Sequence, residues 1–174
     1  MPFDDLRDFL GALEKQGELK RVALSIDPHL EMAAFADRSV KTGGPALLFE
    51  NPKGSRVPLV INAFASLRRM QIALGVEDIE DIARRIAGFI ELQKPEGFIE
   101  KVKLLPKLGE VNAAFPKTVS GGPCKEVVRK RDFSLDEFPI LHCRPGDAGR
   151  FITLPLVFSR DPARCKRKCG MYRM

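Results

Sequence analysis

No apolar run in this sequence approaches the roughly 20 residues that a membrane-spanning helix requires. The first residues, MPFDDLRDF, are acidic where a secretory signal peptide would be basic and then apolar. Internal repeats and low-complexity segments are also absent, and the composition does not suggest disorder throughout. These absences predict a cytoplasmic protein without a membrane span.

Glycine-rich phosphate loops are missing as well. The two glycine pairs lie in GGP at Gly43–Pro45 and at Gly121–Pro123, and the proline after each pair prevents a nest of backbone N–H groups at that point. Both segments are interpreted as turns. The sequence has only two histidines, His29 and His142, and neither has a nucleophile motif around it.

Cysteine is scarce and falls entirely in the last third of the chain, at Cys124, Cys143, Cys165 and Cys169. Because a cytosolic chain keeps its thiols reduced, a disulfide framework is disfavoured. His142, Cys143, Cys165 and Cys169 are zinc-ligand types. No Cys-x-x-Cys pair exists, however, and the adjacent His142 and Cys143 point to opposite faces of an extended segment. The spacing therefore disfavours a zinc site.

Positive charge is concentrated near the end of the chain. The formal net charge is +6, and the residues from Arg160 onward contribute +5 of it, since six basic residues accompany a single acidic one, Asp161. The six are Arg160, Arg164, Lys166, Arg167, Lys168 and Arg173. A cationic loop without interleaved aromatic residues fits recognition of a nucleic-acid strand badly. A non-catalytic α/β domain whose basic hairpin binds an acidic partner or nucleic acid remains the alternative to an enzyme.

The amino-terminal half predicts helices packed against a mixed sheet. Asp4 or Asp5 caps a helix that carries Leu6–Leu13 and stops at Gly17. The expected elements that follow are a strand over Leu19–Ile26, a helix from Asp27-Pro28 to Gly43, strands over Ala46–Phe49 and Val57–Ile61, a helix over Ser66–Leu74 closed by Gly75, and a helix capped by Asp78 that ends near Pro95. Ala46–Phe49 lacks alternation, as expected for a strand covered on both faces.

A change of character after Pro95 predicts a domain over 1–95, a linker over 96–122 and a second domain over 123–174. In the second domain, strands are expected over Cys124–Val128, Ile140–His142, Phe151–Phe158 and Cys169–Met174, with a turn-rich connection over Asp132–Phe138. The last two strands form a hairpin with a long cationic loop. Alternation places Met171 and Arg173 on one side of it and Gly170 and Tyr172 on the other. Because the hairpin ends flush with the last residue, we expect the chain to be truncated.

Several of these stretches resemble one family. FITLPLVF with the following Asp-Pro turn and GMYRM, together with DLRDFLGALEKQGELKRV and GGPALLFENPKG, are similar to the UbiD-type decarboxylases, which include 3-octaprenyl-4-hydroxybenzoate carboxy-lyase. The resemblance covers essentially the whole chain and about the first third of the family's usual length. It implies an amino-terminal α/β domain followed by the first strands of an incomplete, flavin-reductase-like split β-barrel.

The resemblance also implies a reaction and a site. The family carries out non-oxidative decarboxylation or carboxylation of aromatic or α,β-unsaturated acids with prenylated FMN and Mn²⁺, and its full-length members form homo-oligomers. Arg173 matches the arginine that lies beside the flavin in the acid-base network, and Met171 and Tyr172 match cofactor contacts. Thr153 is a candidate for lining the site. From residue types alone, an edge-strand arginine that faces water is the favoured interpretation of Arg173, and the other three would be packing residues.

Two positions depart from the family pattern. Lys168 stands where the family has an asparagine ligand of the divalent metal, and an ammonium group offers no acceptor to a cation. A lysine there can still contact a phosphate directly. Arg144 stands where tryptophan is common, which removes a large apolar surface if the site is internal. Because the family's acid-base carboxylates and other metal ligands lie beyond YRM, we expect the fragment to be inactive alone.

Overall fold

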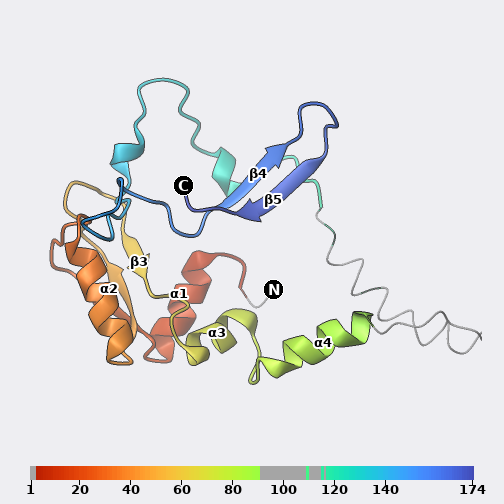
Figure 1. Ribbon diagram of the computed structural model, residues 1–174, viewed down its shortest axis with the longest axis horizontal. Coiled ribbons are helices and arrows are strands. Elements are labelled where there is room, and N and C mark those ends of the chain that lie inside the picture. The colour runs from red at the N-terminus through yellow and green to blue at the C-terminus, as the bar shows by residue number, and fades with distance from the viewer. Residues whose placement is uncertain (1–2, 91–108, 110–114, 116) are drawn as a thin grey trace, which may run out of the picture. The chain divides into compact units, whose positions relative to one another are not determined.

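The computed structural model describes residues 3–90, 109, 115 and 117–174 of the protein. Its helices and strands (Figure 1) are α1 (Leu6–Lys15), β1 (Leu19–Val22), α2 (Glu31–Lys41), β2 (Ala46–Phe49), β3 (Leu59–Ile61), α3 (Leu67–Leu74), α4 (Glu80–Ile90), the 3-10 turns η1 (Pro123–Lys125) and η2 (Leu135–Glu137), β4 (Leu156–Arg160) and β5 (Arg167–Met171). They group into two compact units. One unit combines Met1–Gly75 with Ser134–Met174, and the other is Val76–Phe133.

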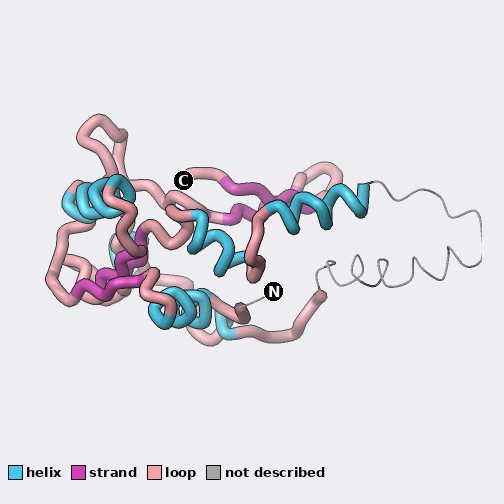
Figure 2. The backbone as a smooth tube through the Cα atoms, turned by 90° about the horizontal axis from the view of Figure 1, so that it is seen from below, coloured by secondary structure: helices cyan, strands magenta, loops and turns pink. Residues whose placement is uncertain are grey.

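The first three strands form a mixed sheet in the order β1-β2-β3 (magenta in Figure 2). β1 runs parallel to β2, with Leu19 opposite Ala46, and β3 runs antiparallel to β2, with Ile61 opposite Leu47. In the central strand Ala46, Leu47 and Phe49 are all buried, as expected for a strand covered on both faces. The predicted α/β class with a mixed sheet is therefore confirmed.

Helix α1 begins and ends where its sequence predicts. The Asp5 side chain accepts a hydrogen bond from the N–H of Asp8 at 3.0 Å, which satisfies one of the free amides of the first turn. Gly17 takes φ +73° just past the helix, a conformation that costs a residue without a side chain little. The ends of helix α3 are likewise set by neighbouring residues. The side chain of Ser66 accepts a hydrogen bond from the N–H of Arg69 at 3.2 Å, and Gly75 is left-handed at the end of the helix.

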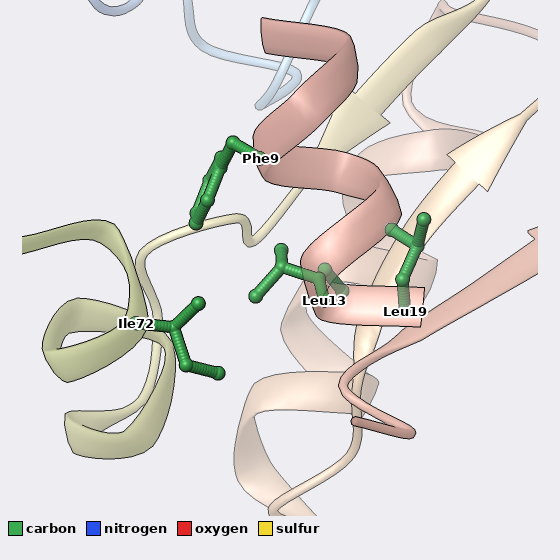
Figure 3. Packing of buried hydrophobic residues seen from close by; sticks show 5 residues of the cluster. Phe9, Leu13, Leu19 and Ile72 are labelled. Carbon is green, nitrogen blue, oxygen red and sulfur yellow. The ribbon is translucent and has the colours of Figure 1, made fainter. Parts of the chain in front are cut away.

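One core cluster joins α1, α3 and the start of β1. Phe9 and Leu13 of α1 point toward Ile72 of α3, with Leu19 at the other side of Leu13 (Figure 3). Leu13 has no exposed surface and Phe9 stacks on Phe64 at a ring separation of 5.5 Å. Burial of such a side chain stabilises the fold by about 2 kcal/mol. The two locally capped helices are thus fixed to the sheet by this cluster.

Helix α2 starts later than predicted. The sequence places its start at Asp27-Pro28, but the helix begins at Glu31, after Leu30 with φ +68° and without a side-chain cap. The backbone before the helix pairs with a distant segment instead. His29 forms a parallel bridge with His142, and the N–H of Leu30 donates to the carbonyl of His142 at 3.0 Å. A contact with residues far along the chain thus overrides the local helix signal.

A second core cluster lies beneath α2. Met32 and Phe49 are fully buried there together with Ile26, Leu47 and Ile61. Leu141, 80 positions further along than the last of these residues, packs against the same cluster, and the carbonyl oxygen of Pro28 accepts a hydrogen bond from the N–H of His142 at 3.2 Å. Segment 134–174 therefore shares a core with the amino-terminal layer. The predicted linker over 96–122, much of which lies outside the described residues, stays a prediction.

Two predicted strands are wrong. Cys124–Val128 forms the 3-10 turn η1 followed by irregular chain, since Pro123 favours the first position of a tight turn and removes a backbone donor. Ile140–His142 is reduced to isolated bridges, in which Leu141 pairs with Phe151 and His142 with His29. Two further strands are shorter than predicted, since β1 ends at Val22 and β3 begins at Leu59. The predicted end of the fourth helix, beyond Ile90, lies outside the described residues.

The predicted hairpin exists, but with shifted ends. β4 begins at Leu156 rather than Phe151 and extends to Arg160, while β5 begins at Arg167 rather than Cys169 and ends at Met171. Pro155, which has no N–H to donate, separates β4 from the segment before it. The loop of the hairpin is correspondingly shorter than the sequence suggested.

Candidate functional site

The hairpin β4–β5 presents two different faces. Alternation along antiparallel strands puts residues of equal parity on one face. One face carries the cross-strand pairs Leu156 with Met171, Phe158 with Cys169, and Arg160 with Arg167, all of them exposed. The other face carries the pairs Val157 with Gly170, and Ser159 with Lys168. We call the first face the outer strip.

Backbone pairing continues irregularly beyond the hairpin. The N–H of Ile152 donates to the carbonyl of Met174 at 2.8 Å and the N–H of Met174 returns a bond to Ile152 at 3.2 Å. Four positions separate Ile152 from Leu156 whereas three separate Met174 from Met171, so the chain between Ile152 and Leu156 holds one residue more than its partner. This bulged segment contains Thr153 and brings it to the same end of the hairpin as the GMYRM residues.

Arg173 is held between a carboxylate and an aromatic ring. Its Nη2 lies 3.5 Å from Oδ1 of Asp147, and its guanidinium carbon lies 3.8 Å from the centre of the Phe151 ring. The Arg173 side chain is 53% exposed, whereas that of Asp147 is only 17% exposed. The arginine is thus neither a free edge residue in water nor a buried ion. It is fixed on two sides and open on a third.

Asp147 is itself held in place by a tight turn. Its Oδ2 accepts a hydrogen bond from the N–H of Arg144 at 3.1 Å, and its own N–H donates to the carbonyl of Arg144 at 3.0 Å. The turn is the Arg-Pro-Gly-Asp segment, and Arg144 is exposed in it. The sequence analysis missed Asp147, although it is the only acidic residue between Glu137 and Asp161 and follows a Pro-Gly turn signal.

Gly170 permits a close contact with the ring of Tyr172. A Cβ placed on Gly170 would lie 2.6 Å from Cε2 and 2.9 Å from the hydroxyl oxygen of Tyr172, closer than such atoms approach. The Tyr172 ring therefore lies against the bare backbone of β5, while 60% of its surface stays exposed. Met171 is also exposed, at 62%. Tyr172 and Met171 thus provide accessible apolar surface next to Arg173.

The predicted metal position does not offer metal ligands. Lys168 is exposed and lies across from Ser159, so the position presents an ammonium group and a hydroxyl. Asp161 is the nearest acidic residue in the sequence, and its Oδ1 already accepts from the N–H groups of Ala163 and Arg164, at 2.8 and 3.2 Å. The described part of the chain contains no cluster of three His, Cys, Asp or Glu side chains suited to a metal ion. A Mn²⁺ ion does not fit these residues.

Thr153 lies at an apolar groove. The groove has a volume of about 930 Å³ and is formed by β3 and the residues after it, by the segment around Phe138–Leu141, and by Phe151–Leu154. Phe64, which stacks on Phe9 in the core, is 47% exposed and lines it. Phe151 also lines the groove, and its ring packs against the guanidinium of Arg173. Apolar surface and a cationic group therefore lie next to each other at this end of the hairpin.

Comparison with family models places the chain. Residues 10–86 match the 3-octaprenyl-4-hydroxybenzoate carboxy-lyase N-terminal domain, and residues 117–174 match the Rift-related domain of the same enzyme family. The chain belongs to the UbiD family. The resemblance inferred from GMYRM and the amino-terminal motifs is thereby confirmed. Within the part of this chain that the structure describes, no helix has the length and apolar character needed to span a bilayer.

Relatives of this UbiD-family chain are considerably longer. It is 48% identical to an uncharacterized protein of Archaeoglobus fulgidus over 174 residues, 100% of this chain and 35% of that protein. It is 43% identical to an uncharacterized protein of Aquifex aeolicus, covering 99% of this chain and 36% of that one. The chain therefore spans about a third of the length of the curated relatives it matches.

Solved structures of UbiD-class enzymes share the fold. An evolved dimeric form of HmfF from Pelotomaculum thermopropionicum, in complex with prFMN, matches with a TM-score of 0.74 and 29% identity, covering 98% of this chain and 35% of that one. HmfF in complex with FMN matches at 0.72 and 30%, covering 97% and 33%. The closed form of vanillic acid decarboxylase from Sedimentibacter hydroxybenzoicus matches at 0.74 and 27%, covering 98% and 34%.

Proposed function

We propose that this chain supplies the flavin-side part of a UbiD-type carboxy-lyase that decarboxylates, or carboxylates, an aromatic or α,β-unsaturated acid without oxidation. The observation that supports the proposal most is the arrangement of Arg173 at the end of β5, between Asp147 and Phe151. The reaction takes place in the cytoplasm and its substrate is a small-molecule acid. The enzyme that carries it out is a homo-oligomer of longer subunits. The chain alone, at about a third of the length of its relatives, binds cofactor but does not turn substrate over.

The guanidinium of Arg173 binds the carboxylate of the substrate. Its planar fork of donors matches two carboxylate oxygens, and its half-exposed edge is accessible to a ligand. Asp147 offsets the positive charge on one side, and the Phe151 ring keeps the guanidinium plane from rotating freely. The substrate carboxylate is thus positioned before any bond is broken, which lowers the entropic part of the barrier.

The flavin would be held by exposed apolar surface. Met171 and Tyr172 provide it at the end of β5, Thr153 borders the neighbouring groove, and the bare backbone at Gly170 lets the Tyr172 ring lie close to it. When bound, prenylated FMN supplies an electron sink for the carbon that loses CO₂. The residues of the chain orient the substrate acid against that group. Lys168 offers no ligand atom to a divalent cation, so Mn²⁺ has no part in this proposal.

A chimera tests this function. The 174 residues replace the matching third of the Archaeoglobus fulgidus relative, which is 48% identical over that stretch, and the product is loaded with prenylated FMN. Loss of substrate is followed by chromatography with vanillic acid, 3,4-dihydroxybenzoic acid and cinnamic acid. We expect decarboxylation of at least one acid by the chimera and none by the 174-residue chain.

Matched variants separate binding from folding. Arg173→Ala in the chimera should abolish turnover, Asp147→Asn should weaken substrate binding, and Arg7→Ala, which removes an exposed charge from α1, should change neither. Unfolding midpoints of all variants are compared first. A folded, flavin-loaded chimera whose Arg173→Ala variant retains full turnover would refute the assigned role of Arg173.

A further inference from the structure

Leu30, the residue before α2, lies at the centre of a strained turn. Its φ of +68° and ψ of −38° fall in a region that residues with a side chain rarely adopt, and the N–H of Glu31 donates to the carbonyl of His29 at 2.8 Å. A hydrogen bond across three residues with a positive φ in the middle makes a γ-turn of the rare, strained kind. A change of conformation at Leu30 would therefore release free energy.

The residues around this turn already form the cap of a longer helix. Oδ1 of Asp27 accepts from the N–H of His29 at 2.8 Å, and Oε2 of Glu31 accepts from the N–H of Asp27 at 2.9 Å, as in a reciprocal helix cap. Pro28 suits the first position of a helix. The N–H of Met32, however, donates to the carbonyl of Asp27, five residues back, at 3.2 Å, whereas an α-helix bonds four residues back. The first turn thus contains one residue too many.

His142 occupies backbone groups that a regular first turn of α2 would use. The carbonyl of Pro28 accepts from the N–H of His142 at 3.2 Å, although in a continuous helix its donor would be the N–H of Met32. The N–H of Leu30 donates to the carbonyl of His142 at 3.0 Å, and the ring centres of His29 and His142 lie 4.6 Å apart. Because a right-handed Leu30 turns these backbone groups along the helix axis, a longer helix and the pairing with His142 exclude each other.

We propose that segment 27–31 is a conformational switch with two states. In the first state, which is the one described above, the γ-turn at Leu30 binds His142 and holds segment 134–174 on the amino-terminal layer. In the second state, Leu30 becomes right-handed, α2 extends backwards under the Asp27 cap, and His142 is released. The helix signal of the sequence describes the second state. The strain of the γ-turn brings the two states closer in free energy.

The switch is connected to the candidate site through two contacts. The carbonyl of Leu141, the neighbour of His142, accepts a hydrogen bond from the N–H of Phe151 at 2.9 Å, and the Phe151 ring lies 3.8 Å from the guanidinium carbon of Arg173. Release of His142 therefore loosens the support of Phe151 and changes the position of Arg173. This regulation goes beyond the function proposed above, and its test requires neither flavin nor substrate.

A pair of substitutions at Leu30 tests the switch. Leu30→Gly and Leu30→Ala both remove the leucine side chain beyond Cβ, but glycine accepts a positive φ without strain, whereas alanine favours the right-handed helix. We expect the amide of His142 to exchange with solvent about tenfold more slowly in Leu30→Gly than in Leu30→Ala, with equal exchange in the two variants at amides within α1. Ala34→Gly is the matched control. Position 34 is exposed and helical in both states, so this substitution should leave the exchange of His142 unchanged.

Cα chemical shifts at the start of α2 identify the second state. Leu141→Ala weakens the packing of its segment on the second core cluster. In that background, Leu30→Ala should move the Cα shifts of Pro28 and His29 toward helical values, and Leu30→Gly should not. Exchange of His142 that is the same in the two Leu30 variants, or that changes equally within α1, overturns the switch. Release of His142 without a helical shift at Pro28 and His29 also overturns it, because the segment then detaches without an extension of α2.

Discussion

Two arginines show how burial changes the role of the same side chain. Arg173 is half exposed and keeps donors accessible, whereas Arg69 of α3 is only 2% exposed and is fixed internally. Nη1 of Arg69 donates to Oε2 of Glu18 at 2.8 Å and to the carbonyl of Gly44 at 3.1 Å. Nε of Arg69 is buried and has no hydrogen-bond partner among the residues that the structure describes. The first arginine leaves its guanidinium open to solvent on one side, and the second joins α3 to the chain segments that enter β1 and β2.

Substitution of Glu18 should therefore destabilise the fold more than the loss of an ordinary surface carboxylate would. Glu18→Ala leaves the buried Arg69 guanidinium without its counter-charge, and we expect a loss of about 2 kcal/mol in the free energy of unfolding. Replacement of both groups, in Glu18→Gln with Arg69→Met, should recover part of the loss, because an apolar side chain needs no partner. Urea unfolding of the unsubstituted chain, of Glu18→Ala and of the double variant measures these differences in stability. A double variant less stable than Glu18→Ala would contradict this account.

Asp27 should make stability depend on pH. The N–H of His29 donates to its carboxylate at 2.8 Å and lowers the pKa of Asp27, with a further contribution from Lys53 at 3.3 Å. A pKa lower in the folded state stabilises the fold above the unfolded value of about 3.9, and this contribution is lost as the pH falls below it. Asp27→Asn should therefore lower the unfolding temperature at pH 7, and this effect should become smaller as the pH falls below about 3.9. Asp37→Asn is the control, since Asp37 pairs with Lys41 on the surface of α2.

At the scale of elements, local signals were reliable and long-range pairing was not visible in the sequence. The cap at Asp5 and the left-handed Gly75 are set within four residues, so α1 and α3 were predicted well. The late start of α2 depends on His142, more than a hundred positions away, and no local pattern reveals it. The same distinction holds in the site, where Arg173 was predicted from its motif but its partner Asp147 was missed.

Addition of one methyl group at Gly170 in β5 tests the contact between this residue and the ring of Tyr172. Gly170→Ala places a Cβ 2.6 Å from the Tyr172 ring, so the ring must move away from the backbone. Because Tyr172 is the only tyrosine and tryptophan is absent, we expect its emission to become more accessible to acrylamide, with a stability change below about 1 kcal/mol. Gly149→Ala, where a Cβ meets nothing within 4 Å, is the control. Unchanged quenching in Gly170→Ala would show that the ring does not lie there.

At the scale of the whole molecule, segment 134–174 joins the amino-terminal layer through few contacts. Leu141 packs on the second core cluster, His142 bridges to His29 with their ring centres 4.6 Å apart, and the hydroxyl of Ser55 donates to the carbonyl of Glu137 at 2.7 Å. Within the described part of the chain, the buried Nε2 of His142 has no hydrogen-bond partner, which makes this joint weaker than its burial suggests. Since Arg173 and Phe151 lie on this segment, the position of the site depends on the joint.

Leu141→Ala should loosen this joint selectively. The substitution removes apolar contacts with the second cluster, but it leaves Phe9, Leu13 and Ile72 of the first cluster intact. We expect faster hydrogen exchange at the amides of Leu30 and His142, which bond across the joint, because opening one contact exposes both.

Amides within α1 should keep their protection in the same Leu141→Ala sample, because the buried residues of α1, Phe9 and Leu13, belong to the first cluster. Leu154→Ala is the matched control, since it shortens a leucine that is 61% exposed on the same segment. Equal acceleration in α1 and at the joint would mean that the two clusters open together, and the site would then be as stable as the whole unit. Selective acceleration at the joint would instead show that the segment with Arg173 detaches before the sheet unfolds.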